Sequence, residues 1–209
     1  MNNRKPIFFT ADWHIGHANC INFDERPFRD VEHMHEVLIR KYNAQVPDHG
    51  VGYFLGDIGV SSTAKTLEVI SRLNGTKVLI LGNHDKSMNS MYNCGFDVVL
   101  NGAVLWIQGI KVTLSHCPLK GLYREDLSHI PEERRRGEVN WHGESRNDAY
   151  TFNDEGQVHL HGHIHSRPGI ENIKTKTLYK QFDVGVAANA YQPVPISTIE
   201  SWISKLRGE

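Results

Sequence analysis

The chain has 209 residues, and its 23 Lys and Arg residues nearly balance its 24 Asp and Glu residues. This length suits one domain with a well-buried core. The near-neutral charge argues against a general nucleic-acid coat or a membrane-surface protein, because both kinds of protein are basic.

The first half of the chain alternates strands with helices. Short apolar runs predict buried strands at 7–10, 51–55 and 77–81. Asp30 can cap a helix that begins at Val31 and has one apolar face, formed by Met34, Val37, Leu38 and Tyr42. This β-α-β order favours a layered α/β fold with buried sheets.

A second helix is predicted between the second and third strands. Ser61 or Ser62 can cap it, and Gly75 is expected to end it as the residue after the C-cap. Its inward-facing residues are expected to be Leu67, Ile70 and Leu73.

The second half of the chain has a different character. Runs at 98–100, 103–107 and 111–115 predict three adjacent strands, with turns at Asn101-Gly102 and Gly109. Further strands are predicted at 157–160 and 181–184, and Pro195 precedes a C-terminal amphipathic helix. Residues 118–153 are polar and rich in charge, so we expect them to form a lid-like insertion over a site.

Five short segments have Asp, Asn and His just beyond the ends of predicted strands. Ligands in open α/β sheets bind beyond the carboxyl ends of the strands, so one edge of the fold can bring these residues together. Singly, each segment is explained as well by a turn, a helix cap or a surface histidine, but five in one chain make chance a poor explanation. The segments are Asp12-Trp13-His14, Gly56-Asp57, Gly82-Asn83-His84-Asp85, Ser115-His116 and Gly162-His163-Ile164-His165.

Histidine is unusually frequent, with 13 residues, which in a neutral chain indicates a metal site, a pH sensor or an expression tag. These histidines are interior and interleaved with glycine and aliphatic residues, unlike those of a tag. Oxygen and imidazole ligands without a thiolate favour Mn, Fe, Zn, Ni or Co over Ca or an iron–sulfur cluster.

The five segments, in this order, resemble the pattern of the calcineurin-like metallophosphoesterases over nearly the whole chain. The stretch from Val184 to Val194 is also similar to one in small bacterial and phage members, although Gln192 stands where they often have Arg. The resemblance implies a single domain over residues 1–209 with the four-layer α/β metallophosphoesterase fold, in which two packed mixed β-sheets are flanked by helices.

The resemblance also implies a role for each polar residue of the segments. Asp57 would bridge two metal ions, and His84, oriented by Asp85, would face the leaving group as a catalytic residue. One ion would be held by Asp12, His14 and His165, and the other by Asn83, His116 and His163. Manganese is the expected cofactor, with iron, zinc or nickel as alternatives.

A pair of such ions predicts a mechanism for phosphoester hydrolysis. A hydroxide that bridges the ions attacks phosphorus in line, and His84 acts as general acid toward the leaving alkoxide. The expected substrate is a small phosphomonoester or phosphodiester, and nucleotide-derived compounds are candidates. Tyr123, Trp141 and Tyr150 of the insertion can stack a base.

Three residues near the motifs are candidates for substrate binding. His17 can hydrogen-bond a phosphoryl oxygen or stabilise its own loop, and Arg26 is a similar candidate. His142 can lie in the lid-like insertion. His159 and His161 share the alternation of the last motif, and we assign them to structure.

Two other functions stay open at this point. A metal-dependent nuclease of the same superfamily would usually carry a capping domain or a broader basic groove, so we expect no stable binding of nucleic acid. The run Arg134–Arg136 is interpreted as a solvated helix end. A non-catalytic scaffold would have lost ligands or the general acid, and none is lost here. The sequence leaves the oligomeric state open.

The sequence also carries expectations about the compartment. No apolar region follows residues 1–6 as a secretory signal requires, and no run approaches the ~20 apolar residues of a membrane span. Cys20, Cys94 and Cys117 are an odd number without metal-type spacing, which predicts reduced thiols. We therefore expect a cytoplasmic protein without a membrane partner.

Overall fold

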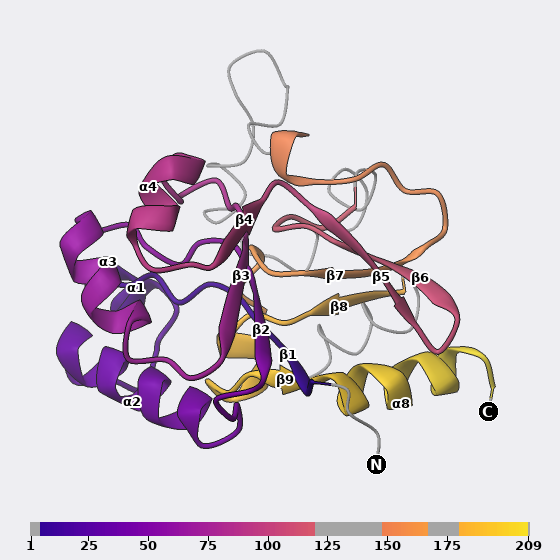
Figure 1. The fold of residues 1–209 in the computed structure, drawn as a ribbon, viewed down its shortest axis with the longest axis horizontal. Coiled ribbons are helices and arrows are strands. Elements are labelled where there is room, and N and C mark those ends of the chain that lie inside the picture. The colour runs from indigo at the N-terminus through magenta and orange to yellow at the C-terminus, as the bar shows by residue number, and fades with distance from the viewer. Residues whose placement is uncertain (1–4, 120–147, 167–179, 209) are drawn as a thin grey trace.

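Two β-sheets pack face to face, with helices on the outside (Figure 1). The computed structural model describes residues 5–119, 148–166 and 180–208. Two mixed sheets flanked by helices confirm the predicted fold class. The helices that cover the outer face of the first sheet are α1 (Asn19–Phe23), α2 (Val31–Asn43), α3 (Thr63–Ile70) and α4 (Met88–Asn93), and α8 (Ile196–Leu206) lies beside the second sheet.

The first sheet has the strand order β4-β3-β2-β1-β9. Its strands are β1 (Ile7–Thr10), β2 (Val51–Leu55), β3 (Thr76–Ile80), β4 (Val98–Leu100) and β9 (Val194–Pro195). The first four run parallel, and β9 pairs antiparallel with β1. The predicted bounds of β1 and β2 are confirmed, and β3 both begins and ends one residue earlier than predicted.

The second sheet has the order β5-β6-β7-β8. Its strands are β5 (Ala103–Ile107), β6 (Ile110–Leu114), β7 (Val158–His161) and β8 (Gln181–Asp183). β5 and β6 form an antiparallel hairpin, whereas β6, β7 and β8 run parallel. The predicted turn at Gly109 is confirmed, and this glycine has a φ of +76°.

The predicted pairing of strand 98–100 with strand 103–107 is wrong. β4 pairs with β3 in the first sheet, so the Asn101-Gly102 turn connects the two sheets. Val99 is buried in the cluster beneath the helices. A turn signal is local, and it cannot say which sheet buries the strand before it.

Both predicted helix caps of the first half are present. The Asp30 side chain accepts a hydrogen bond from the backbone N–H of His33 at 2.7 Å. The Ser62 hydroxyl accepts one from the N–H of Lys65 at 3.2 Å. Each cap satisfies one of the N–H groups that the first turn of a helix leaves unpaired.

The predicted inward face of α3 is partly wrong. Ile70 is buried, but Leu67 is 41% exposed, because the buried face carries Thr66, Val69 and Ile70. The helix also ends at Ile70, so Gly75 does not end it. Gly75, with a φ of +76°, instead lies in the turn before β3.

Short helices escaped the sequence prediction, whereas the long C-terminal helix did not. α1 and α4 have five and six residues, too few to show a helical period, and the 3₁₀ turns η2 (Asp148–Tyr150) and η3 (Ala187–Asn189) are shorter still. α8 is confirmed, and its buried residues are Ile199, Trp202 and Ile203.

The core has two parts, one on each face of the first sheet. Alternation along each strand sends Phe54 into the cluster under α1–α4 and Leu55 into the cluster between the sheets. Leu79 and Ile80 divide in the same way. Trp202 of α8 adds to the second cluster and meets Phe182 of β8 at a ring distance of 5.3 Å.

The parallel strands of both sheets end along the seam between the sheets. Ala11, just after β1, forms an isolated bridge with Gly185, just after β8. Residues 120–147, most of the predicted insertion, lie outside the described residues. No helix within the described ranges is long and apolar enough to cross a membrane.

Candidate dimetal site

The polar residues of the five motifs lie in loops that follow strands, at the seam where the two sheets meet. Three loops follow β1, β2 and β3, and two follow β6 and β7. Backbone hydrogen bonds join neighbouring loops: the N–H of Asp12 donates to the carbonyl of Gly56 at 3.0 Å, and the N–H of Gly162 to that of His116 at 2.9 Å. The loops therefore fix one another in place.

Five of the motif residues adopt the left-handed backbone conformation, which residues other than glycine rarely adopt. The φ angles are 60° for Asp12, 52° for His14, 56° for Asp57, 70° for His163 and 46° for His165. Each such residue costs on the order of 1 kcal/mol or more, and such strain clusters at functional sites. This concentration is typical of a binding site and not of ordinary turns.

Asp12, His14 and His165 form the first group of potential metal ligands. The Nε2 atoms of His14 and His165 lie 3.0 Å apart, and His165 Nε2 is 3.7 Å from Asp12 Oδ1. One ligand atom from each residue lies within 4.8 Å of the others. Two ring nitrogens at this distance can share only one proton, whereas a cation would be a partner for both.

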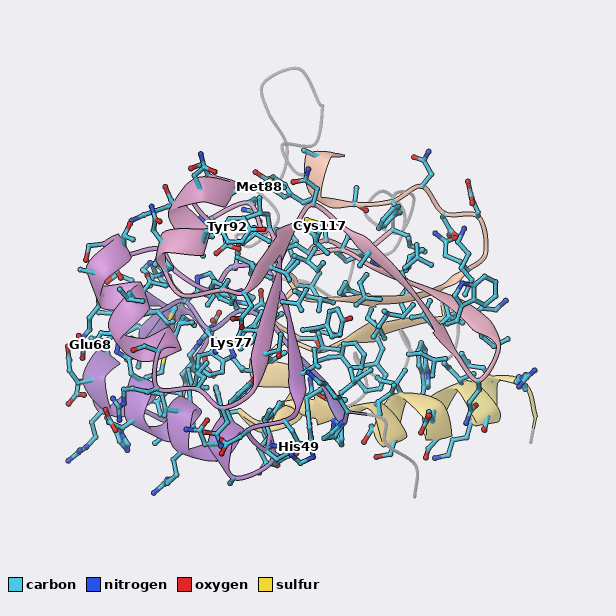
Figure 2. The ribbon with its side chains drawn as sticks, in the orientation of Figure 1. His49, Glu68, Lys77, Met88, Tyr92 and Cys117 are labelled. Carbon is cyan, nitrogen blue, oxygen red and sulfur yellow. The ribbon has the colours of Figure 1, made fainter. Side chains whose placement is uncertain are left out.

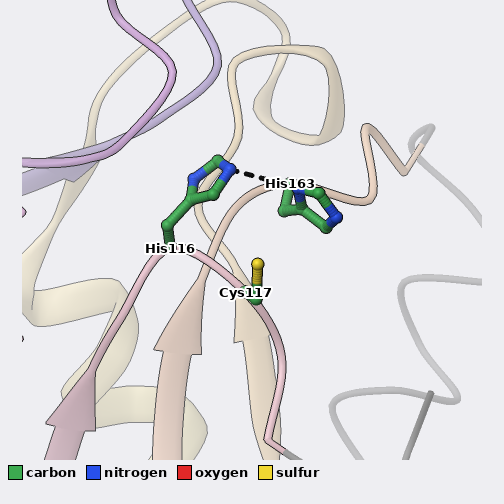
Figure 3. Close-up of side chains that lie close together, drawn as sticks. All are labelled: His116, Cys117 and His163. Atoms are coloured by element: carbon green, nitrogen blue, oxygen red, sulfur yellow. Dashed lines mark hydrogen bonds between the residues drawn. The ribbon is translucent and has the colours of Figure 1, made fainter. Parts of the chain in front are cut away.

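Asn83, His116 and His163 form the second group. His116 Nε2 lies 2.9 Å from Asn83 Oδ1. It lies 3.1 Å from His163 Nδ1 (Figure 3). The sulfur of Cys117 also lies within 4.8 Å of ring nitrogens of His116 and His163 (Figure 3). A soft sulfur atom therefore lies beside this group, although the spacing of the cysteines in the sequence did not predict a cysteine near the ligands.

Asp57 lies between the two groups. Its Oδ2 is 3.8 Å from His14 Nε2 in the first group and 3.3 Å from His116 Nε2 in the second. Its other oxygen accepts a hydrogen bond from the backbone N–H of His84 at 2.9 Å. This is the geometry that a ligand shared by two ions needs.

The donor set fits a pair of transition-metal ions. The side chains of Asp12 and Asp57 are 1% and 2% exposed, and within the described ranges neither pairs with a Lys or Arg. A buried carboxylate needs a compensating positive charge. Carboxylate, amide and imidazole atoms in one pocket suit Mn, Fe, Zn or Ni.

Comparison with known proteins agrees with this geometry. The sequence profile of the calcineurin-like phosphoesterases matches residues 5–167. The chain belongs to the calcineurin-like phosphoesterases. An uncharacterised protein of the archaeon Methanocaldococcus jannaschii is 30% identical and aligns over 98% of this chain and 94% of its own length.

Two further proteins are similar to this chain over nearly its whole length. The gene 66 protein of Mycobacterium phage D29 is 28% identical, over 96% of each chain. The crystal structure of a protein of unknown function from Aquifex aeolicus superimposes with a TM-score of 0.69 at 22% identity, over 95% of this chain and 99% of that one. The last comparison shows that the two proteins share a fold.

Burial and neighbouring charges act against each other at the carboxylates and histidines of this candidate site. Burial raises the pKa of Asp12 to about 7, against the opposing charges of His165 and His116. Burial also disfavours a charged His116, but the charge and hydrogen bond of Asp57 raise the pKa of His116 to about 10. The same pairing holds the pKa of Asp57 well below its usual range in spite of burial. A proton on His116 thus balances Asp57 where a metal ion would otherwise do so.

Asp85 has a different partner from the one that the family resemblance implies. Its carboxylate accepts hydrogen bonds from four backbone N–H groups, those of Asp57, Ile58, Gly59 and Gly82, at 2.9–3.3 Å. Among the described residues it makes no hydrogen bond with the ring of His84. It therefore ties the loop after β2 to the loop after β3.

His84 itself is exposed at the rim of the site. Its ring centre lies 5.9 Å from that of His14. Its backbone N–H holds Asp57 Oδ1, as described above. The side chain is thus free to meet a ligand, while its backbone is fixed to the carboxylate between the two groups.

The three candidates for substrate binding differ in their surroundings. His17 is half-buried beside the first group, 5.7 Å from the His14 ring, and its buried Nδ1 has no hydrogen-bond partner. Arg26 is buried, and its guanidinium is occupied by protein atoms, which argues against substrate binding. His142 lies outside the described residues.

The second-sheet histidines behind the site are buried and hydrogen-bonded. His159 contacts the hydroxyls of Thr113 and Ser115 at 2.8 and 3.1 Å, and burial lowers its pKa to about 3. His161 Nδ1 donates to the carbonyl of Gly162 at 2.8 Å. Both placements agree with a structural role.

Sequence reasoning missed two carboxylates. Asp183 is fully buried and accepts hydrogen bonds from the N–H groups of Ser166 and Gly185. Asp24 accepts a hydrogen bond from His165 Nδ1 at 2.8 Å. Neither residue belongs to a motif, and Asp24 is 141 positions from its partner, so no local pattern could have indicated the contact.

Proposed function

We propose that this protein hydrolyses a small phosphomonoester or phosphodiester with the help of two transition-metal ions. The observation that carries the proposal is the position of Asp57 between two groups of ligands, with the exposed His84 beside it. The family supports phosphoester hydrolysis as the reaction class.

The proposed ligands divide into two sets with one shared member. Asp12, His14 and His165 would hold one ion, Asn83, His116 and His163 the other, and Asp57 both. When bound, such a pair supplies Lewis acidity, which favours attack of water on phosphorus and neutralises the phosphoryl oxygens. We propose manganese, with iron, zinc or nickel as alternatives, because this donor set suits all four metals.

His84 is proposed as the general acid. The oxygen of a leaving alcohol must gain a proton as the P–O bond breaks, and an imidazolium can give it. The exposure of the ring leaves it accessible to a substrate. The hydrogen bond from its backbone to Asp57 would hold His84 beside the carboxylate that is proposed as the shared ligand.

Asp85 is proposed to hold the loops that carry Asp57 and Asn83. Four N–H groups converge on its carboxylate. Burial raises the pKa of this carboxyl to about 6, with the charge of Asp57 acting in the same direction, while the N–H groups of Gly82 and Ile58 lower it. At neutral pH the anion therefore persists as a clamp between two loops.

Substrate contacts are proposed for two further regions. His17 has a buried nitrogen without a partner beside the first ligand group, which supports a hydrogen bond to a phosphoryl oxygen. Residues 118–153 are proposed as a lid of the single domain, in which His142, Tyr123 and Trp141 contact a nucleotide-type substrate. Tyr150, by contrast, packs against the core cluster under the helices.

The deciding experiment is hydrolysis of a panel of phosphoesters by the manganese-loaded protein. The panel should contain aryl and alkyl monoesters, bis-p-nitrophenyl phosphate, nucleotides, DNA and RNA. We expect metal-dependent turnover of small esters. Cleavage confined to DNA or RNA would make the protein a nuclease, and no hydrolysis at full metal occupancy would favour a scaffold.

The general acid has its own test within this panel. We expect His84→Ala to keep both ions and to lose about 10²–10⁴-fold in kcat for alkyl esters, with a smaller loss for aryl esters whose leaving groups need less help from an acid. His49→Ala is the matched control, since His49 is exposed at the end of the molecule opposite Cys117 (Figure 2). Equal losses for all leaving groups would remove His84 from this role.

A further inference from the structure

Asp24 is a nearly buried carboxylate that joins an arginine to one of the proposed metal ligands. It lies between α1 and α2, and its side chain is 8% exposed. Its Oδ2 accepts hydrogen bonds from Arg26 Nε at 3.1 Å and Nη2 at 3.0 Å, and from His165 Nδ1 at 2.8 Å. One oxygen thus connects the loop after α1 with a histidine from the loop after β7.

The contact with Asp24 determines which nitrogen of His165 can bind a metal. Because Nδ1 faces a carboxylate, it carries a proton and donates it. Nε2 is then turned toward Asp12 Oδ1 and His14 Nε2, at 3.7 and 3.0 Å. Carboxylates that bond the far nitrogen of a histidine in this way fix the ring and raise its basicity as a ligand.

Arg26 extends the same network to the other two members of the first group. Its side chain is fully buried, and Nη2 and Nη1 donate to the backbone carbonyls of Asp12 and Trp13 at 3.0 and 3.3 Å. These carbonyls belong to the turn that carries Asp12 and His14. A planar guanidinium can donate hydrogen bonds to this turn and to Asp24 at the same time and in a fixed geometry, which a lysine ammonium could not do.

Within the described residues, neither Asp24 nor Arg26 contacts a member of the second group. The far nitrogen of His116, Nδ1, contacts the backbone carbonyl of Leu55 at 2.8 Å. Its other neighbours, Asn83 and His163, are themselves proposed ligands. The Asp24–Arg26 pair therefore touches only the first group.

We infer that Asp24 and Arg26 are positioning residues for one of the two proposed metal ions, the one assigned to Asp12, His14 and His165. This inference rests on the proposed dimetal function. It assigns the support of this buried ion pair to the first position alone, because the pair contacts the first group and not the second. Loss of Asp24 should therefore weaken the two positions unequally.

The inference is tested by titrating the metal-free protein with Mn²⁺ in a calorimeter and with Co²⁺ in a spectrophotometer. Wild-type protein is expected to bind two ions. Asp24→Ala should bind one ion as tightly as wild type and the other about 10–100-fold more weakly. Asp24→Asn keeps an oxygen that can accept from His165, so its loss should be clearly smaller than that of Asp24→Ala.

Glu36→Ala is the matched control. Glu36 also loses an arginine partner when it is replaced, since it pairs with Arg72 at 2.5 Å, but this pair is on the surface. The control should bind both ions as wild type does. The melting temperature of each metal-free variant distinguishes positioning from folding, because positioning predicts a change in one metal affinity beyond any loss of stability.

Two outcomes would overturn the inference. One is an Asp24→Asn or Asp24→Ala protein that binds both ions like wild type. The other is equal weakening of both ions, which would indicate a general structural role. A wild-type protein that binds fewer than two ions would instead refute the dimetal function itself.

Discussion

Metal removal should lower the thermal stability of this protein strongly, because the proposed ligands join segments that are far apart in the chain. They run from Asp12 to His165 and follow strands of both sheets. In the unfolded chain only short-range pairs such as His163 and His165 remain close together. The ions should therefore bind the folded state almost exclusively, and they should stabilise the packing of the two sheets against each other.

The size of the effect follows from linkage. An ion at 100 times its Kd stabilises the folded state by about 2.7 kcal/mol, so two independent ions contribute about 5 kcal/mol. For a chain of 209 residues, each 1 kcal/mol shifts the melting temperature by about 2–4 °C. The expected difference between the loaded and the metal-free protein is therefore about 10–20 °C.

Differential scanning calorimetry can measure this difference. One sample would contain excess chelator, and the other Mn²⁺ at 100 times the Kd obtained from a separate titration. His163→Ala should show about half the shift, and His49→Ala all of it. If the wild-type protein binds two ions but melts at the same temperature with and without them, the site does not stabilise the packing of the two sheets.

Three further outcomes are expected. Asp12, with its raised pKa of about 7, must lose a proton before it binds metal, and so must His165, whose pKa is raised by its hydrogen bond to Asp24 in spite of burial. Affinity at the first position should therefore fall by at least about tenfold per pH unit below pH 7. Calorimetry in buffers of different ionisation enthalpy checks this, and pH-independent affinity would contradict it. Asp85→Ala leaves four N–H groups without their acceptor, and it should lower the free energy of unfolding by about 2–4 kcal/mol, as measured by urea denaturation. A decrease of less than ~1 kcal/mol would show that solvent replaces the carboxylate. In Gly82→Ala the new Cβ would lie 2.4 Å from Asp57 Oδ1, so the proposed shared ligand must move. A metal titration should show weaker binding of both ions, and unchanged affinities would exclude Asp57 as a bridge.

The sequence predicted those parts of the fold that depend on local patterns. β1 and β2 were predicted with their observed bounds because each is a buried apolar run that stops at a polar loop. The caps of α2 and α3 were predicted because a capping side chain and its partner are three residues apart. The predicted ligands were recognised from short motifs, and the fold brings them to one seam.

The parts that were missed depend on contacts between distant segments. The Asn-Gly turn after β4 gave no information about the sheet in which β4 pairs. The outward position of Leu67 follows from the register of α3 on its sheet. Asp85 was expected beside the ring of its neighbour, but the loop after β2 supplies N–H groups that take up its carboxylate. Asp24 gained its partner only through folding.

The left-handed backbone at five of the proposed ligands has a consequence for evolution and engineering. Together these residues carry on the order of 5 kcal/mol of conformational strain, in a chain whose whole folding free energy is of order 5–15 kcal/mol. Glycine would relieve that strain at any of the five positions, but it would also delete a ligand. Variants selected for heat resistance alone, with no metal in the medium, should therefore replace these residues by glycine first. The selected proteins would be more stable but would no longer bind metal.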